Sequence, residues 1–212
     1  MAKIPIVYCT GNSSKKEEWQ AISQHFTLPR PSGKVSVGEL FEASFRGASL
    51  REPLLCDLHA VVREKAISAY EAIRVPCIVE HAGLIFHDLE AHSYPGGLTQ
   101  PMWDALKAEG FVRMKGVAGA RVTARAIVGY CDGLKVHLFH GETQGVISES
   151  PRGLRDFYWD NVFCPDDGGD RTYSEIADEP DGLIAKMHLS QSRKATMAFL
   201  TYRIDNEPQL FI

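Results

Sequence analysis

The stretch IPIVYCTGNSSKKEEW, residues 4–19, contains the change of pattern that decides the fold. Its apolar run Ile4–Cys9 has the length and residue types of a short buried strand, and that strand stops at a small polar turn. A helix is predicted over residues 14–26, because one face carries apolar side chains spaced three and four apart, at Trp19, Ile22 and Phe26. Asn12 or Ser13 is the expected N-cap of this helix.

The turn between this strand and helix admits a structural and a chemical interpretation. A tight glycine turn before a helix N-terminus offers exposed N–H groups to an anion, and Lys15 in the first helical turn adds a cation. A capped helix start with a solvated first turn explains the same residue types. The phosphate-loop pattern G-x-x-x-x-G-K-[ST] is missing from the sequence, so the turn alone does not decide between the two.

Strands and helices continue to alternate along the chain. Helices are predicted at residues 57–73, 103–109 and 190–202, and strands at residues 74–80, 121–131, 134–140 and 145–149. Asp57 and Ser190 are expected helix N-caps, and Asp132-Gly133 is a hairpin turn. Only short strands are expected between residues 35 and 55, and loops are predicted at residues 27–34, 92–101 and 165–173. We therefore expect an α/β or α+β fold with a mixed sheet.

The composition is that of an ordinary soluble protein. The chain has 212 residues, a hydrophobic fraction of 44%, a charged fraction of 24% and a net charge of −4. This length suits one domain, or one two-lobed unit, over residues 1–212. Scattered basic residues without a net excess argue against nucleic acid as a partner. Five widely spaced cysteines without a C-x-x-C pair favour a reducing cytoplasm, and no apolar run is long enough to cross a membrane.

A second polar cluster, in VPCIVEHAGL, places Glu80 and His81 at the expected carboxyl end of a buried strand. Open α/β sheets bind ligands outside such strand ends. Glu80 is an oxygen ligand suited to Mg²⁺, and His81 has the chemistry of a base or a ligand. A histidine at a strand end is also a common structural residue, so both interpretations stay open.

Two later segments concentrate aromatic and basic side chains. The segment PRGLRDFYWDNVF, residues 151–163, has the residue types that stack on a base and contact a phosphate. A twisted strand with aromatic core residues is the commoner origin of such a run. The segment KMHLSQSRKA, residues 186–195, gathers donors ahead of a helix start, which suits an anion, a polar base edge or simply a helix cap.

Taken in order, these segments carry a recurring set of motifs. The motifs are T-x-N-x-x-K-x-x-E, a K-A pair before an E-D-[ST]-G-L strand end, a P-G loop, P-R-G, F-G-[YW]-D-P-x-F, T-[FY]-A-E-M and K-N-x-[IV]-S-H-R. The matching residues here are Thr10, Asn12, Lys15, Glu18, Lys65-Ala66, Glu80, Pro95-Gly96, Gly145, Ile147, 151–153, Phe157, Trp159, Asp160, Phe163, 172–176 and 186–192. The chain thus resembles the inosine triphosphate pyrophosphatase (Ham1-like) family, which hydrolyses non-standard purine nucleoside triphosphates to monophosphate and pyrophosphate. The match covers nearly the whole chain and is least clear at residues 28–55.

The resemblance implies a fold and a set of residue roles. The fold is a long, twisted mixed β-sheet flanked by helices, in two lobes with a central cleft, and the family is typically homodimeric. The residues implied in substrate binding are Thr10, Asn12, Lys15, Phe157, Trp159, Asp160, Lys186, Gln191 and Ser192. Those implied in catalysis are Lys15, Glu80 and His81, and the carboxylates implied in binding Mg²⁺ are Glu80 and Glu52.

The chain departs from the family pattern at positions that carry chemistry. His81 stands where E-D-[ST]-G-L has the carboxylate thought to activate water or complete the metal site. Gln191 and Ser192 stand where S-H-R has the His and Arg that read the 6-oxo group of hypoxanthine or xanthine. Tyr158 and Asn161 replace the Gly and the Pro of F-G-[YW]-D-P.

These departures leave more than one function open. Imidazole in place of a carboxylate weakens Mg²⁺ binding and favours softer ions such as Mn²⁺, yet a neutral His81 can act as general base. Gln191 both donates and accepts hydrogen bonds, so the base pocket need not select a 6-oxo purine. We expect a metal-dependent nucleoside triphosphate pyrophosphatase with altered base specificity. The alternatives are a nucleotide-binding protein that has lost hydrolysis and a hydrolase acting on a nucleoside monophosphate.

Overall fold

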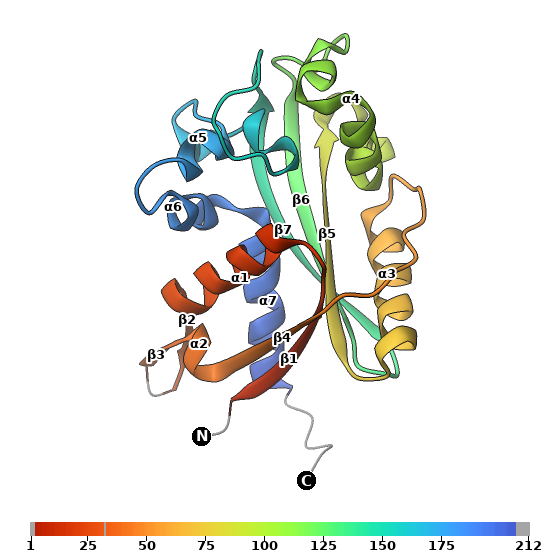
Figure 1. Ribbon diagram of the computed structural model, residues 1–212, viewed down its shortest axis with the longest axis vertical. Coiled ribbons are helices and arrows are strands. Elements are labelled where there is room, and N and C mark those ends of the chain that lie inside the picture. Colours follow the sequence, from red (N-terminus) through yellow and green to blue (C-terminus); the bar gives the residue numbers. More distant parts are fainter. Residues whose placement is uncertain (1–2, 32, 207–212) are drawn as a thin grey trace.

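The computed structural model describes residues 3–31 and 33–206, and its centre is a six-stranded mixed β-sheet (Figure 1). Its strands, in spatial order, are β4 (Phe41–Arg46), β1 (Ile4–Cys9), β5 (Cys77–Phe86), β6 (Arg121–Cys131), β7 (Val136–Ile147) and β8 (Phe163–Pro165). β1 runs parallel to β4 and β5, whereas the pairs from β5 to β8 are antiparallel. The predicted mixed sheet is therefore confirmed.

Helices cover both faces of this sheet. The α-helices are α1 (Ser13–His25), α2 (Val37–Leu40), α3 (Leu58–Ile73), α4 (Thr99–Arg113), α5 (Tyr173–Ala177), α6 (Gly182–Leu189) and α7 (Gln191–Asp205). Short 3₁₀ turns lie at η1 (His87–His92), η2 (Gly96–Leu98), η3 (Tyr158–Asn161) and η4 (Asp166–Gly168). Successive residues of β6 point to opposite faces. Ala126 and Val128 pack in the cluster with α7, and Ile127 packs in the cluster with α3.

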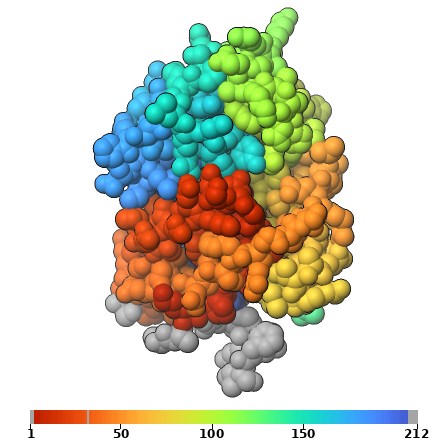
Figure 2. Space-filling view, viewed as in Figure 1, coloured from red at the N-terminus to blue at the C-terminus, as the bar shows by residue number. Residues whose placement is uncertain are grey.

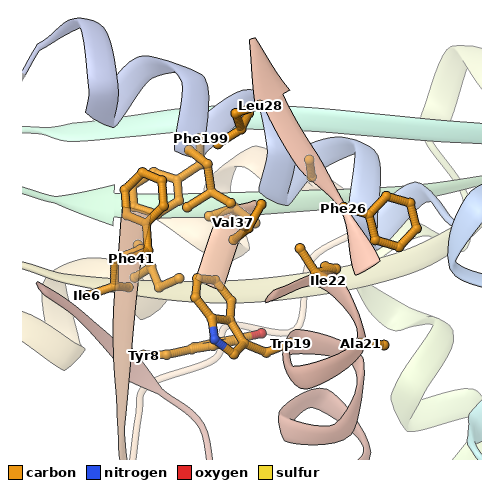
Figure 3. Close-up of a cluster of buried hydrophobic side chains, with 14 of the residues drawn as sticks. Ile6, Tyr8, Trp19, Ala21, Ile22, Phe26, Leu28, Val37, Phe41 and Phe199 are labelled. Carbon is orange, nitrogen blue, oxygen red and sulfur yellow. The ribbon is translucent and has the colours of Figure 1, made fainter. Parts of the chain in front are cut away.

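The long strands β5, β6 and β7 join two lobes (Figure 1). One lobe holds α1, α3 and α7. Figure 3 draws the cluster that α1 and α7 form with the sheet, in which Trp19 of α1 lies beside Tyr8 of β1. The other lobe packs α4, η3 and α5 over the far ends of the same strands, around Phe111, Phe163 and Tyr173. No helix among the described residues combines the length and the apolar character needed to cross a membrane.

The opening strand–turn–helix unit forms as predicted. β1 ends at Cys9, and Asn12 is the N-cap of α1, because its side-chain Oδ1 accepts a hydrogen bond of 3.3 Å from the backbone N–H of Lys15. Trp19, Ile22 and Phe26 are buried, as the helical spacing requires. Asp57 and Ser190 also cap α3 and α7 through their side chains.

The expected strand end at Glu80 and His81 is wrong. Both residues lie in the middle of β5, which continues to Phe86 because β6 pairs with it along its whole length. The parallel neighbour β1 stops sooner, and its only register partner on β5 is Ile78. The strand end that lies beside these residues is therefore that of β1, and not that of β5.

Other predicted boundaries also change. The predicted loop at 27–34 forms most of two short antiparallel strands, β2 (Thr27–Arg30) and β3 (Gly33–Ser36), because the two segments pair with each other. The two predicted strands at 134–140 and 145–149 are one strand, β7, paired with β6 throughout. α4 begins inside the predicted loop 92–101, α6 was not predicted, and the aromatic segment 151–163 contains η3 in place of a twisted strand.

Candidate active site

A cavity with a volume of about 210 Å³ lies between the two lobes. In Figure 2 the N-terminal segment (red) lies directly below the segment that precedes β8 (cyan), near the mid-height of the molecule. All residues that the sequence analysis assigned to substrate, metal or catalysis line this cavity: Thr10, Asn12, Lys15, Glu52, Glu80, His81, Phe157, Trp159, Asp160, Lys186, Gln191 and Ser192. The fold thus brings together side chains from β1, α1, α3, β5, η3, α6 and α7.

One end of the cavity carries two lysine ammonium groups. Lys15 Nζ and Lys65 Nζ donate hydrogen bonds of 3.3 and 3.2 Å to the same backbone carbonyl, that of Glu80. Burial and the neighbouring Lys15 together lower the pKa of Lys65. The turn at Thr10 and the N-terminus of α1 line the same end. This end of the cavity therefore has the charge and the N–H groups of an anion site.

Three donors hold the carboxylate of Glu80, which also lines the cavity. Tyr8 donates to Oε2 at 2.7 Å, Ser192 donates to Oε1 at 2.8 Å, and Lys15 Nζ lies 3.4 Å from Oε1. Burial works against ionisation, but Lys15 and the hydroxyls of Tyr8 and Ser192 hold the pKa of Glu80 below its usual value. Glu80 is therefore a carboxylate anion that anchors the groups around it.

Glu52 links Lys65 and His81. Glu52 Oε1 lies 3.0 Å from Lys65 Nζ, and Oε2 lies 3.3 Å from His81 Nδ1. The hydrogen bond with His81, together with Lys65, lowers the pKa of Glu52 to about 2 although burial opposes this. Burial, with Lys65 and Lys15 nearby, lowers the pKa of His81 against the opposing effect of Glu52. His81 is thus a neutral imidazole near neutral pH.

The other ring nitrogen of His81, Nε2, is buried and has no hydrogen-bond partner among the residues that the structure describes. A neutral imidazole that directs its Nδ1–H to a carboxylate carries its lone pair on Nε2. Because His81 lines the cavity, that lone pair is an acceptor available to a ligand or a water.

The carboxylates of Glu52 and Glu80 suit a metal ion that enters together with an anionic ligand better than a metal ion that is permanently bound. Among the residues that the structure describes, no three His, Cys, Asp or Glu side chains are grouped to hold an ion. Mg²⁺ commonly uses one or two protein carboxylates and takes further oxygens from substrate phosphates. Glu52, which is 39% exposed, and Glu80 behind it provide such a pair at the lysine end of the cavity.

The opposite end of the cavity is built on a buried ammonium. Lys186 Nζ donates to Glu18 Oε1 at 2.8 Å and to Asp160 Oδ2, and it lies 5.0 Å from the centroid of the Phe157 ring. Asp160 and Glu18 together raise the pKa of Lys186 against burial. Burial raises the pKa of Asp160 to about 6. The ammonium of Lys186 opposes this only in part, because it is shared with the second buried carboxylate, that of Glu18. Arg155 Nε, 3.7 Å from Asp160 Oδ2, is a more distant cation.

Two further side chains complete this aromatic end. Tyr173 donates a hydrogen bond of 3.0 Å to Gln191 Oε1, which leaves the amide nitrogen of Gln191 to face other groups. Trp159 is buried, and its indole Nε1 has no hydrogen-bond partner among the described residues. A ligand with acceptor atoms can meet both donors. Ser192, in contrast, is engaged with Glu80 and lies at the junction of the two ends.

Several residues at the site received no role from the sequence. Lys65 and Glu18 were recognised only as parts of motifs, and Tyr8 and Tyr158 were not assigned. Glu18 and Lys65 have the spacing of ordinary helix residues, and only the packing of α1 and α3 directs them into the cavity. Tyr8, on β1, acts on the site through its hydrogen bond to Glu80. Of these residues, only Lys65 could have been assigned to the site from the sequence, because Lys65-Ala66 matches the recurring K-A pair.

An anion-binding turn with lysines at one end and buried aromatic rings at the other defines an α/β protein whose cleft suits a nucleotide. The chain belongs to the Ham1 family, whose model matches residues 6–202. "Inosine triphosphate pyrophosphatase 2" of Trypanosoma cruzi (strain CL Brener) is 30% identical over 182 residues, which cover 85% of this chain and 85% of that relative. A "dITP/XTP pyrophosphatase" of Methanopyrus kandleri is 28% identical over 203 residues, covering 95% and 97%. The family resemblance is therefore confirmed.

Solved structures show the same fold. A HAM1 protein from Coxiella burnetii superposes with a TM-score of 0.63 at 19% identity, and the match covers 96% of this chain and 99% of that one. A protein from Mycobacterium abscessus described as a nucleoside-triphosphatase or dITP/XTP pyrophosphatase gives a TM-score of 0.61 at 17% identity. At such identities the likeness establishes the architecture, and the site must be argued from its own residues.

Proposed function

We propose that this protein hydrolyses a nucleoside triphosphate to the monophosphate and pyrophosphate. The names of its curated relatives support this reaction class. The observation that carries the proposal is the single cavity that joins a lysine-rich anion site to a buried aromatic pocket, with an imidazole nitrogen beside the lysines that has no partner among the described residues. A nucleoside triphosphate has the matching order of parts, with its phosphates at the anion site, its base in the aromatic pocket and its sugar between them.

The attacking group is a water molecule activated by His81. Nε2 accepts a proton from the water as its oxygen forms a bond to the α-phosphorus, and the bond from that phosphorus to the pyrophosphate oxygen breaks. Glu52 holds Nδ1–H at 3.3 Å, which fixes the tautomer that leaves Nε2 free. Lys15 and Lys65 neutralise the charge that grows on the departing pyrophosphate.

A divalent ion fits this arrangement as a companion of the triphosphate. Glu52 and Glu80 are the carboxylates that would hold it, and its charge would help to neutralise the phosphates. Mg²⁺ is the expected ion and Mn²⁺ the alternative, since an imidazole replaces a carboxylate beside Glu80.

We also infer an altered base specificity. The family's His and Arg are donors, whereas Gln191 is a neutral amide whose oxygen is held by Tyr173 and whose nitrogen is left to the base. Ser192 is directed to Glu80 and not to the base. Fewer cationic donors should reduce the preference for a 6-oxo purine over other bases.

The direct test is a substrate panel. Purified protein is incubated with ITP, XTP and the four standard triphosphates, with Mg²⁺ or Mn²⁺, and pyrophosphate and phosphate are measured separately. We expect pyrophosphate from at least one nucleotide. Lys15→Met should reduce this activity, whereas Lys16→Met is a matched control, because the neighbouring lysine lies over the Phe45 ring and does not line the cavity. Nucleotide binding without any product would refute the hydrolase and favour a binding protein.

Substitution of His81 separates two interpretations of that residue. If His81 is the working base, His81→Asp should lower the activity on the preferred substrate. If it is only a lost carboxylate, the same change should raise hydrolysis of ITP or XTP and overturn the assignment of Nε2 as the proton acceptor.

A further inference from the structure

Tyr158 occupies a backbone position that ordinarily calls for glycine. Its φ of 47° lies in the left-handed region, which side chains other than Gly, Asn and Asp rarely adopt. The family motif F-G-[YW]-D-P has glycine at this point. A non-glycine residue here carries a backbone strain that usually accompanies function. The side chain of Tyr158 lines the cavity.

The ring of Tyr158 lies in the wall between the two ends of the cavity. Its centroid is 5.2 Å from that of Phe157 and 6.2 Å from that of Trp159, the aromatic end. It also packs against the cluster that includes Trp103 of α4. Tyr158 and Asn12 line the same cavity, although they come from different lobes.

The Tyr158 hydroxyl reaches the edge of the anion site. Burial and Asp104 raise the pKa of Tyr158, while a hydrogen bond with Asn12 works in the opposite direction. The side-chain oxygen of Asn12 is already used to cap α1. Its amide group is therefore the donor that meets the phenol oxygen.

The hydroxyl of Tyr158 lies between the two ends of the cavity. The rings of Phe157 and Trp159 pack beside the Tyr158 ring, and the hydroxyl meets Asn12, the cap of the turn at the anion site. A neutral phenol both donates and accepts a hydrogen bond, so it suits a hydroxyl group of the ligand. In a nucleotide that spans the cavity, the group between the base and the phosphates is the sugar.

We propose that Tyr158 contacts a sugar hydroxyl of the bound nucleotide and sets the selectivity between ribose and deoxyribose. This inference rests on the proposed function, because it takes the cavity to hold a nucleotide. Tyr158 combines a stacking ring with a hydroxyl that both donates and accepts, which glycine at this position would not provide.

The test compares Tyr158→Phe with the wild type on ITP, 2′-deoxy-ITP and 3′-deoxy-ITP. This substitution keeps the ring and the backbone and removes only the hydroxyl. We expect the wild type to prefer ITP over one of the deoxynucleotides, and Tyr158→Phe to reduce that ratio of kcat/KM about 3- to 10-fold, the effect of one hydrogen bond. Tyr202→Phe, which removes a hydroxyl on α7 outside the cavity, should leave the ratio unchanged.

Ratios for both deoxynucleotides that stay within about twofold of the wild type in Tyr158→Phe would overturn the inference. Tyr158→Gly gives a second measurement, since glycine relieves the left-handed strain. If this variant loses several degrees of Tm and keeps the wild-type sugar ratios, Tyr158 is only a packing residue and the inference fails. If the wild type hydrolyses none of the three nucleotides, the comparison is made with the ribo, 2′-deoxy and 3′-deoxy forms of the nucleotide that the substrate panel identifies. If that panel gives no product at all, the proposed function fails, and the sugar ratios are then read from nucleotide-induced shifts in Tm.

Discussion

Replacing Lys186 by methionine should destabilise the protein strongly, because it leaves two carboxylates buried without their cation. Lys186 is 2% exposed and binds both Glu18 and Asp160, which are also buried. Breaking a buried ion pair by removing one partner costs about 3–5 kcal/mol. For a chain of this size that corresponds to a fall in Tm of about 6–20 °C at pH 8.

The loss should depend on pH in a defined direction. The pKa of Asp160 is about 6 in the folded protein with Lys186 present, above its ordinary 3.8, and removing the ammonium raises it further. The folded variant therefore binds more protons than the unfolded chain above about pH 4, so its stability falls as the pH rises towards the folded pKa. The difference in Tm from the wild type should be largest near pH 8 and smaller near pH 5.

Thermal unfolding followed by circular dichroism at both pH values measures this. Lys115→Met is the matched control, since Lys115 is exposed and the same atoms are removed. Lys186→Met/Asp160→Asn should recover part of the lost Tm at pH 8, because one of the two stranded charges is removed. A Tm for Lys186→Met within 2 °C of the control, or a loss equally large at pH 5, would show that the ammonium does not hold the two carboxylates.

Three further changes test other parts of the site and fold. Glu52→Gln should lower kcat by about 10- to 100-fold, less than the 10²–10⁴ expected when a general base is lost outright. The pKa of Glu52 is about 2, below its usual value of 4.5, so the ionised carboxylate contributes stability above pH 4.5. That contribution should be missing from the variant when unfolding is measured over an acid titration. Gly83→Ala should destabilise by about 2–4 kcal/mol, since a Cβ would lie 2.1 Å from the Gly96 carbonyl oxygen, whereas Gly47→Ala meets nothing within 4 Å and serves as the control in denaturant melts. The double variant His81→Asp/Ser192→Arg should hydrolyse ITP better than either single variant, by more than the two single effects combined. A kcat/KM for ITP that equals that of a single variant, or the two single effects combined, would count against coupling of the two positions.

The parts of the site that the sequence predicted depend on local chemistry. Asn12 as a helix cap and Lys15 beside it follow from a turn of a few residues, and both are found as expected. Trp19 and Ile22 follow from helical periodicity. Glu80 was expected at the end of its strand but lies in the middle of it, because the length of β5 is fixed by its pairing with β6, where the partner of Glu80 is Val128.

The parts that the sequence could not predict depend on distant partners. Glu18 pairs with Lys186 across 168 residues, and no pattern within α1 distinguishes a buried, paired acid from a solvated one. The left-handed backbone at Tyr158 leaves no mark on residue type, since tyrosine is not a residue that such a conformation favours. Lys65 is aimed at the Glu80 carbonyl only once α3 is packed against β5.

The structure also relates two departures from the family pattern that are far apart in sequence. Ser192 donates to Glu80, whereas His81, the next residue along β5, points to the other face of the strand and contacts Glu52. Lys15 acts on both Glu80 and His81, so the two altered positions share one neighbouring cation. Against the family motifs, His81 removes a negative charge and Ser192 removes a positive one, so the local sum of charges beside Lys15 is unchanged. An arginine at position 192 without the aspartate would add a cation beside Lys15, where like charges raise the free energy. The two departures together therefore conserve the local charge: Glu80 stays ionised, and in the proposed mechanism the imidazole of His81 is the proton acceptor.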